Sequence, residues 1–132
     1  MPDRYRYLAG KCGEDIAAKE YEKRGCRIIA RNWRFGRRGE IDLILEREEG
    51  EEGEKTVVFS VVKLRSDDSF APAAAAVNAK KQMRIRMLAA AFLSQHSEYR
   101  EYSVRFDVVQ IYYGNDLRKS DRFVCDILEN AF

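Results

Sequence analysis

The sequence predicts a protein of the α/β class, in which a mixed central sheet is flanked by helices. The chain has 132 residues, of which 45% are hydrophobic and 11% aromatic, and this size and composition suit one compact core. Its apolar residues follow helical and strand periods in the order α-β-β-β-α-β-β. Such an order favours strands that pair in one sheet with helices on its faces, and we expect a single domain over residues 1–132.

The first half of the chain predicts one helix followed by three strands. The third strand contains the run "VVFSVVK", which is rich in β-branched and aromatic residues and is therefore expected to be buried up to Lys63. The segment 46–55 carries six acidic and two basic residues with two glycines, which predicts a solvent-exposed hairpin loop. The expected elements are a helix over 10–24 that ends at Gly25, and strands over 26–35, 40–46 and 56–63.

The second half predicts a long helix and two more strands. After a polar loop over 66–71, the segment 72–96 has a helical composition. Strands are expected over 102–113 and 122–128, and the short last strand is expected at an edge of the sheet. The core stripe of the helix is expected to consist of Ile85, Leu88, Ala89, Phe92 and Leu93, which follow the i, i+3, i+4, i+7, i+8 spacing.

Basic residues gather in two segments that contain no acid. The net charge is only +2, because the acidic segment 46–55 offsets an excess of basic residues elsewhere. Five arginines occur between residues 27 and 38, and four basic residues occur between 80 and 86. A charge run is often just a solvated surface, but two acid-free basic clusters favour a polyanionic partner.

The sequence shows no membrane segment and no disulfide framework. No apolar run approaches the length that spans a bilayer, and none follows the basic residues at the amino terminus. We therefore expect a soluble, cytoplasmic protein without a membrane partner. Cys12, Cys26 and Cys125 lie far apart and form no CxxC pair, which favours buried, reduced thiols.

Five polar residues occupy positions where the patterns call for apolar ones. They are Glu14 on the first helix, Glu40 and Asp42 on the second strand, Lys63 on the third strand and Gln82 on the second helix. Each alone is explained by an ion pair or by a side chain that reaches solvent. Together they favour a site in which carboxylates hold Mg²⁺ and a lysine stabilises charge on a phosphate.

The chain resembles the YraN-like family of small bacterial proteins, which is assigned to the restriction-endonuclease-like, PD-(D/E)xK nuclease fold. The resemblance rests on "GEDIAAKEYEKRGCRIIARNWRFGRRGEIDLI", "VVFSVVKLR", "KKQ", "RFDVV" and "ENAF", from about Leu8 to Phe132. It implies an α-β-β-β-α-β core. The candidate catalytic residues that it implies are Glu14, Asp42, Lys63 and Gln82, and the candidate metal ligands are Glu14, Asp42 and Glu40.

One position departs from the pattern of that family. An acid is expected two residues before Lys63, and Val61 stands there, with no acid anywhere between 56 and 62. A valine cannot bind a metal, so we expect Mg²⁺ or Mn²⁺ to bind weakly at most. If the missing carboxylate costs about 4 kcal/mol of transition-state stabilisation, hydrolysis would be roughly a thousandfold slower. Glu40, or Asp67 and Asp68 just beyond the lysine, are the available substitutes.

The leading hypothesis is a nucleic-acid-binding protein, with DNA as the expected ligand and cleavage impaired or absent. One alternative is an active Mg²⁺- or Mn²⁺-dependent endonuclease similar to Holliday-junction resolvases, in which Glu40 replaces the missing acid. Another is a non-catalytic assembly subunit, in which Met83, Met87 and Ala90 could form a homodimer contact. The residues expected to contact phosphates are Arg31, Arg34, Arg37, Arg38, Arg65, Lys80, Lys81 and Arg84.

Overall fold

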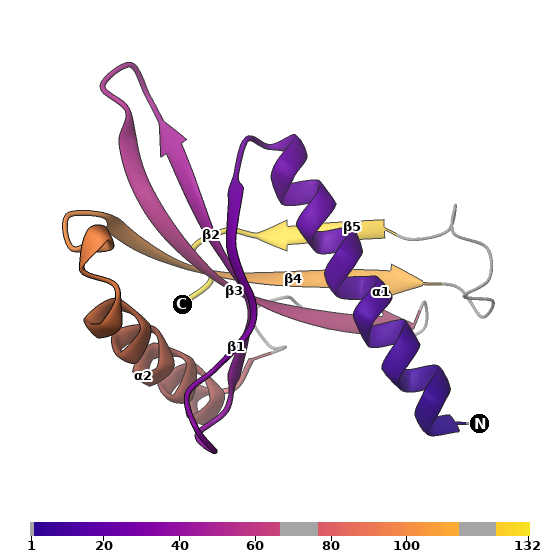
Figure 1. Ribbon diagram of the computed structural model, residues 1–132. Helices are drawn as coiled ribbons and strands as arrows, with labels where there is room; N and C mark the ends of the chain where they lie inside the picture. The colour runs from indigo at the N-terminus through magenta and orange to yellow at the C-terminus, as the bar shows by residue number, and fades with distance from the viewer. Residues whose placement is uncertain (1, 67–76, 114–123) are drawn as a thin grey trace.

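A five-stranded sheet with one long helix on each face forms the framework of the protein (Figure 1). The computed structural model describes the backbone of residues 2–66, 77–113 and 124–132, and the side chains of 13–65, 77–112 and 124–132. The elements are α1 (Pro2–Lys23), β1 (Arg27–Arg34), β2 (Glu40–Glu49), β3 (Glu54–Ser66), α2 (Ala79–Gln95), the 3₁₀ helix η2 (Ser97–Tyr99), β4 (Ser103–Tyr113) and β5 (Val124–Leu128).

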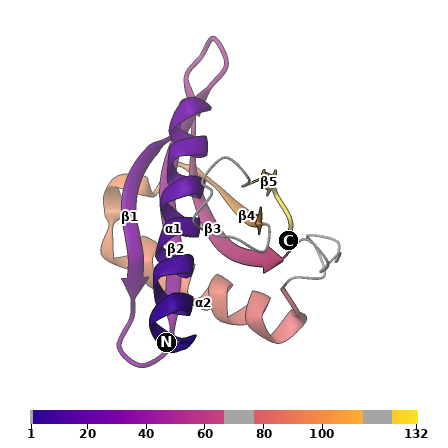
Figure 2. The same ribbon diagram turned by 90° about the vertical axis from the view of Figure 1, so that its right-hand side faces the viewer.

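The sheet is mixed, as the sequence predicts. Its strands lie in the order β1-β2-β3-β4-β5, so β5 is an edge strand. β3 and β4 run parallel, whereas every other neighbouring pair is antiparallel. The parallel pair requires a crossover, and α2 lies in the connection between β3 and β4. Figures 1 and 2 show α1 and α2 on opposite faces of the sheet, which confirms the predicted α/β class.

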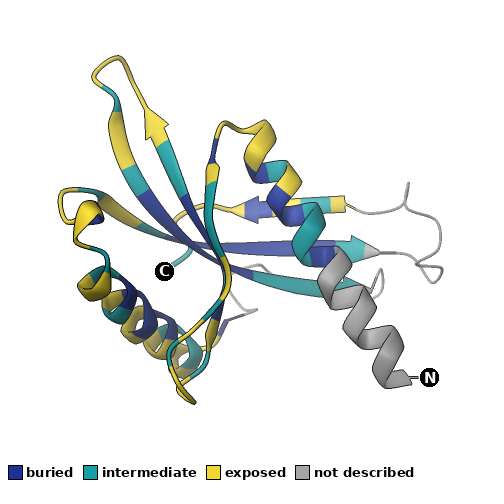
Figure 3. Cartoon of the chain, viewed as in Figure 1, coloured by how far each residue is buried: buried dark blue, intermediate teal, exposed yellow. Residues whose placement is uncertain are grey.

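Alternating residues of β3 supply the apolar cores on both faces. Val57, Phe59 and Val61 belong to the core beneath α2, whereas Val58 faces the core beneath α1. Figure 3 shows buried residues concentrated in the middle of the sheet and on the inward sides of the helices. Since side chains alternate along a strand, Lys63 follows Val61 on the α2 side, just beyond the core.

Most of the predicted core stripe of α2 is buried. Ile85, Leu88, Ala89 and Phe92 are buried, and Leu93 packs partly against them. On α1, a Cβ atom added at Gly13 would lie 3.3 Å from Leu64 Cδ1. The missing side chain at this position therefore allows the helix to approach β3 closely.

The predicted acidic loop over 46–55 is largely strand, which corrects that interpretation. Residues 46–49 pair in register with residues 54–57, and only 50–53 turn. Gly50 and Gly53 adopt φ values of 75° and 68°, which glycine tolerates best, and they close the hairpin. Backbone pairing does not depend on the polarity of the side chains, so these charged residues can still form strands. They make an exposed two-stranded ribbon at the end of β2 and β3.

The other boundaries also differ from the prediction. α1 begins at Pro2 rather than at residue 10, and β3 continues to Ser66, where a loop is predicted. α2 begins at Ala79 because Asn78 caps it, with Oδ1 accepting a hydrogen bond of 2.9 Å from the Lys81 backbone N–H. Residues 67–76, which include most of the predicted loop and the predicted start of this helix, lie outside the described part of the chain.

Two of the three cysteines lie in the described part of the structure. Cys26 is buried and Cys125 is half-buried, and neither forms a disulfide. The side chain of Cys12 lies outside the described residues. Within the described chain, no helix combines the length and the apolarity needed to span a bilayer.

A buried polar network lies beneath α1. Asp107 on β4 is fully buried and accepts two hydrogen bonds from the Arg105 guanidinium, at 2.9 and 3.0 Å. The Tyr21 hydroxyl donates a third bond of 2.8 Å, and it also lies 2.9 Å from the Ser60 hydroxyl. The Asn130 backbone N–H donates a fourth, of 3.0 Å. This network ties α1, the sheet and the C-terminal segment together.

Candidate functional site

A cleft between the start of β2 and the first half of α2 is lined by four of the predicted site residues, Glu40, Asp42, Lys81 and Arg84. Its volume is about 270 Å³. Val61, at the position where the resemblance calls for an acid, is 3% exposed and lies in the wall. The cleft is lined by Gly39, Glu40, Asp42, Val61, Lys81, Arg84, Ile85 and Leu88.

Asp42 helps to shape the cleft through the backbone of β3. Its Oδ2 accepts a hydrogen bond of 2.8 Å from the Val62 backbone N–H, just beyond the paired residues Leu43 and Ser60. Burial raises the pKa of the Asp42 carboxyl, and the charge of Glu40 acts in the same direction. The Val62 N–H and the charges of Lys81 and Lys63 oppose that increase. One carboxylate oxygen is therefore already engaged in holding two strands together.

Lys63 and Lys81 bring two amines to the same place from different elements. Both side chains are half-buried, and they lie close enough for Lys63 to influence the charge of Lys81. Burial, and then the hydrogen bond and charge of Lys63, lower the pKa of the Lys81 amine to about 8. The nearby Asp42 carboxylate opposes this change, while Arg84 adds to it. The structure thus joins Lys81 to Asp42 and Lys63 in one site.

Glu14 lies near this site but does not line the cleft. The Asn32 amide donates a hydrogen bond of 3.1 Å to its Oε2, and Asn32 adopts a left-handed backbone conformation with φ of 50°. Burial raises the pKa of the Glu14 carboxyl, and repulsion from Asp42 and Glu40 adds to this effect, whereas the Asn32 hydrogen bond lowers it. The three carboxylates therefore lie close enough to influence one another's charge.

These carboxylates do not form a metal-binding group. Among the side chains that the structure describes, no three His, Cys, Asp or Glu residues are arranged to hold a metal ion. Asp42 bonds the Val62 backbone, and Glu40 accepts a hydrogen bond of 3.0 Å from Arg34. An apolar side chain, Val61, stands in the cleft wall beside Asp42. The residues present therefore do not fit a divalent cation held by Glu14, Asp42 and Glu40.

The structure places Gln82 at the start of α2 rather than in the cleft wall. Its amide nitrogen donates a hydrogen bond of 3.0 Å to the Val77 backbone oxygen. This bond, like the Asn78 cap, fixes the entry of the chain into the helix. Gln82 thus supports the element that carries Lys81 and Arg84.

A second hollow joins the cleft along the turn between β1 and β2. It has a volume of about 250 Å³ and is lined by Arg34, Gly36, Arg37, Gly39 and Glu40. Gly39 and Glu40 line both hollows, so the two adjoin. Gly39 has a φ of 125°, and a Cβ atom there would lie 3.3 Å from Arg84 Cδ. We call the joined hollows, with Arg34, Arg37, Lys81 and Arg84 in their walls, the cationic groove.

Ion pairs separate the basic residues into two groups. Arg24, Arg27, Arg47 and Arg105, near the α1 side and the long hairpin, all form salt bridges with acidic residues. Of the predicted phosphate-binding residues, Arg31 pairs with Asp15 at 2.7 Å and Arg34 with Glu40 at 3.0 Å. Within the described chain, no salt bridge involves Arg37, Arg38, Lys80, Lys81 or Arg84.

The remaining predicted contact residues lie around the groove. The Arg38 guanidinium stacks over the Phe35 ring, 5.6 Å from its centroid. Lys80 is exposed in the first turn of α2. Arg65 follows Lys63 on β3, and its buried Nε has no hydrogen-bond partner among the described residues. On the outer side of α2, Met83 and Met87 are 72% and 42% exposed, in agreement with the apolar face noted in the sequence.

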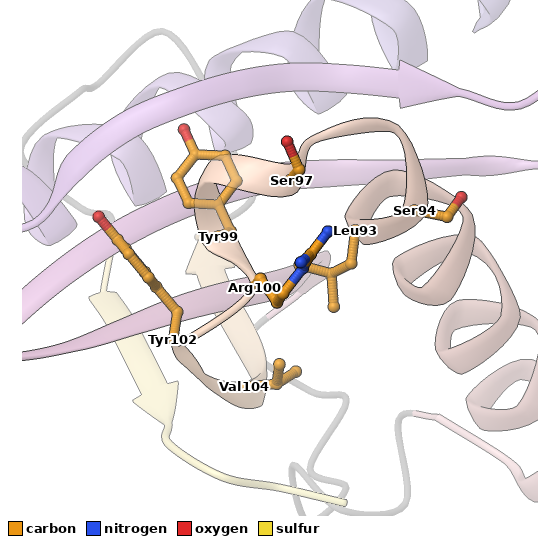
Figure 4. Close-up of a pocket in the computed structure, with 7 residues that line it drawn as sticks. All are labelled: Leu93, Ser94, Ser97, Tyr99, Arg100, Tyr102 and Val104. Atoms are coloured by element: carbon orange, nitrogen blue, oxygen red, sulfur yellow. The ribbon is translucent and has the colours of Figure 1, made fainter.

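A further hollow, which the sequence does not indicate, lies at the other end of α2 (Figure 4). It has a volume of about 370 Å³ and is lined by Leu93, Ser94, Ser97, Tyr99, Arg100, Tyr102 and Val104. Tyr102 donates a hydrogen bond of 2.8 Å to Glu46, and Ser94 donates one of 2.8 Å to the Ala91 backbone oxygen. In Figure 4 the hydroxyls of Tyr99 and Tyr102 point away from the Arg100 guanidinium. The polar groups that line this hollow therefore do not converge on one point.

Comparison with known proteins identifies relatives over most of the chain. A UPF0102 protein of Frankia alni is 41% identical over 111 residues, which cover 84% of this chain and 86% of the relative. A UPF0102 protein of Caldicellulosiruptor bescii is 38% identical over 123 residues, which cover 93% and 95%. The model of the uncharacterised protein family UPF0102 matches residues 13–111. This range spans β1 to β3, α2 and most of β4, and the chain belongs to the uncharacterised protein family UPF0102.

Proposed function

We propose that this protein binds nucleic acid, with DNA as the expected ligand, in the cationic groove. The observation that carries the proposal is that two adjoining hollows are lined by basic side chains, of which Arg37, Lys81 and Arg84 form no salt bridge in the described chain. A phosphate that enters the groove neutralises charges that now repel one another. Contacts of this kind supply most of the affinity of proteins for nucleic acids without reading the sequence.

The first turn of α2 adds to the attraction. It carries Lys80 and Lys81 and no acidic residue. The dipole at the start of a helix, together with the backbone N–H groups that the Asn78 side chain does not cap, favours an anion. The two acids of the groove weaken this attraction only in part, because Glu40 is paired with Arg34 and Asp42 bonds the Val62 backbone. The local field therefore favours phosphate groups.

Binding without metal-assisted cleavage is the mode that these side chains favour. Two-metal and one-metal phosphodiester hydrolysis depend on converging carboxylates. Here Val61 occupies the wall next to Asp42, and the described side chains form no metal-binding group. We propose that the protein recognises nucleic acid and that Lys63 and Lys81 contact phosphate directly.

The test is a titration of labelled duplex, branched and single-stranded DNA over a salt series, with and without EDTA. We expect affinity to fall steeply as salt rises, because each neutralised phosphate of a duplex adds about 0.9 to the slope of log K against log salt. EDTA is expected to leave affinity unchanged. Affinity indifferent to salt would refute the proposal, and Mg²⁺-dependent cleavage lost in Asp42→Ala would favour the endonuclease alternative.

Affinity is also expected to depend on pH through Lys81. Its pKa in the free protein is lowered to about 8, and a bound phosphate stabilises the ammonium form and raises that pKa. Binding therefore takes up a proton above about pH 8, and affinity is expected to fall about tenfold between pH 7 and 9.5. Lys81→Arg should flatten this profile, since arginine stays charged. A profile unchanged in Lys81→Arg would exclude Lys81 as its source.

A further inference from the structure

We infer that the Arg38 guanidinium, held over the Phe35 ring, is a platform on which an unpaired base of bound DNA stacks. This inference rests on the proposed function and names the class of ligand that the cationic groove takes. The observation that carries it is a series of planar side chains that runs from the core to the surface, beside the hollow that Arg34 and Arg37 line.

The series begins in the core beneath α2. Phe92 is 1% exposed, and the Trp33 ring meets it edge-on, with the ring centroids 5.4 Å apart. The Phe35 ring lies nearly parallel to the Trp33 ring, at an interplanar angle of 10° and a centroid distance of 6.2 Å. Both Trp33 and Phe35 are half-buried and pack against the core. The protein itself therefore fixes the position of the Phe35 ring.

The turn between β1 and β2 returns the chain over that ring. The Arg38 backbone N–H donates a hydrogen bond of 3.1 Å to the Phe35 backbone oxygen, and the Arg38 guanidinium lies 5.6 Å from the Phe35 ring centroid. A cation and a ring attract each other at this distance. Arg38 is exposed and forms no salt bridge within the described chain. The guanidinium is therefore oriented by the ring and accessible to a ligand.

A second arginine shows a structural contact of the same kind. The Arg86 guanidinium lies over two rings, 4.9 Å from the Phe106 centroid and 5.5 Å from the Phe132 centroid. These two rings stack on each other, so Arg86 helps to hold the C-terminal segment against β4. Arg38 lies over one ring in the described chain, and its neighbour Arg37 lines the cationic groove. Its place beside the groove distinguishes Arg38 from Arg86.

The same turn carries groups that can hold the phosphate of the stacked nucleotide. Arg34, Gly36 and Arg37 line the hollow of about 250 Å³, and Phe35 and Arg38 lie among them in the chain. The turn is next to α2, because a Cβ atom at residue 39 would lie 3.3 Å from the Cδ atom of residue 84 (Figure 1). A nucleotide with its phosphate in this hollow therefore carries its base close to the guanidinium.

Stacking selects unpaired bases over paired ones. In a duplex the neighbouring bases cover both faces of each base, so a side chain reaches a face only after the base leaves the stack. Single strands, loops and ends leave bases uncovered, and proteins bind these bases with aromatic rings and guanidinium planes. Every base has such a face, so this contact tolerates any sequence. The ligand is therefore single-stranded or locally unpaired DNA.

An abasic oligonucleotide tests the inference, because it keeps the phosphates and lacks the bases. The affinity of the protein for a short oligothymidylate is compared with its affinity for an abasic oligonucleotide of the same length, by fluorescence anisotropy over a salt series. We expect the oligothymidylate to bind about tenfold more tightly, with the same slope of log K against log salt, because stacking adds to phosphate contacts that both ligands make. Equal affinities would overturn the inference.

Arg38→Lys and Phe35→Leu show whether the platform is the source of this preference. The first keeps the charge but removes the planar guanidinium, and the second keeps an apolar side chain but removes the ring. Each is expected to reduce the preference for oligothymidylate to about twofold or less. Arg86→Lys, which removes a stacked guanidinium outside the groove, is the matched control and should leave the preference unchanged. Because Arg38 is exposed, its replacement leaves the core intact, and a preference that survives in Arg38→Lys contradicts the inference.

Failure of the inference is distinguishable from failure of the proposed function. If both oligonucleotides bind with steep salt dependence and equal affinity, the groove binds phosphates as proposed and only the stacking platform fails. If neither oligonucleotide nor a duplex binds at low salt, the proposed function fails and the inference fails with it.

Discussion

Asp107→Asn is expected to lower the free energy of unfolding by about 3 kcal/mol. The carboxylate is fully buried and accepts hydrogen bonds from Arg105, Tyr21 and the Asn130 backbone. An amide of the same shape cannot neutralise the Arg105 guanidinium, whose side chain is only 14% exposed. The more distant Glu129, 3.8 Å from Arg105, offsets part of the loss, so the lower end of the range for broken buried pairs applies.

Urea unfolding monitored by circular dichroism measures this effect. Asp126→Asn on β5 is the control, because that aspartate is exposed and forms no salt bridge in the described chain, and its effect should stay within about 0.5 kcal/mol. A decrease of less than 1 kcal/mol for Asp107→Asn would mean that the network contributes little. Because Ala131 donates a hydrogen bond of 2.7 Å to the Phe106 backbone and Phe132 stacks on the Phe106 ring, faster amide exchange at the C-terminus is also expected.

The triple variant Arg37→Ala, Lys81→Ala, Arg84→Ala is expected to weaken DNA binding more than a hundredfold at low salt. If each side chain meets one phosphate, the slope of log K against log salt should fall by almost 3, since a duplex contributes about 0.9 for each contact. The three residues lie in the walls of the cationic groove, and none forms a salt bridge in the described chain. Fluorescence anisotropy over a salt series measures both quantities.

A matched control removes the same charge from the other basic group. Arg24→Ala, Arg27→Ala and Arg47→Ala together also lower the net charge by three, but these guanidinium groups are already paired with Glu20, Glu46 and Glu129. Their loss should change affinity less than threefold. Equal losses in the two variants would mean that net charge alone governs binding and would contradict the groove as the binding site.

The sequence predicts the order of the elements because burial imposes a period on each of them. Val57, Phe59 and Val61 recur every second residue and Ile85, Leu88, Ala89 and Phe92 every third or fourth, and all are buried. The ends of the elements follow other rules. Residues 46–49 and 54–57 pair through backbone hydrogen bonds across a turn. Because their side chains are charged and exposed, the side-chain pattern does not show that these residues belong to strands.

The candidate site is predicted in part. Asp42 and Lys63 occupy polar positions next to apolar ones, and the structure brings both to the cleft edge beside Lys81. Gln82 carries the same kind of signal but bonds the Val77 backbone instead. Asp107 likewise interrupts the apolar run of "RFDVV", and its four hydrogen bonds are to groups of the protein itself. A polar residue in a core position thus indicates a partner, but not whether that partner is a ligand.

By itself, the sequence determines the class of the fold, the basic character of the segments around β1 and α2, and the absence of an acid from residues 56–62 of β3. Each of these properties depends only on residues that are close together in the chain. Only the tertiary structure decides which basic side chains remain available to a ligand, because ion pairs join residues that are far apart in the chain. Arg47 is neutralised by Glu129, 82 positions away, whereas the fold leaves Lys81 facing another lysine.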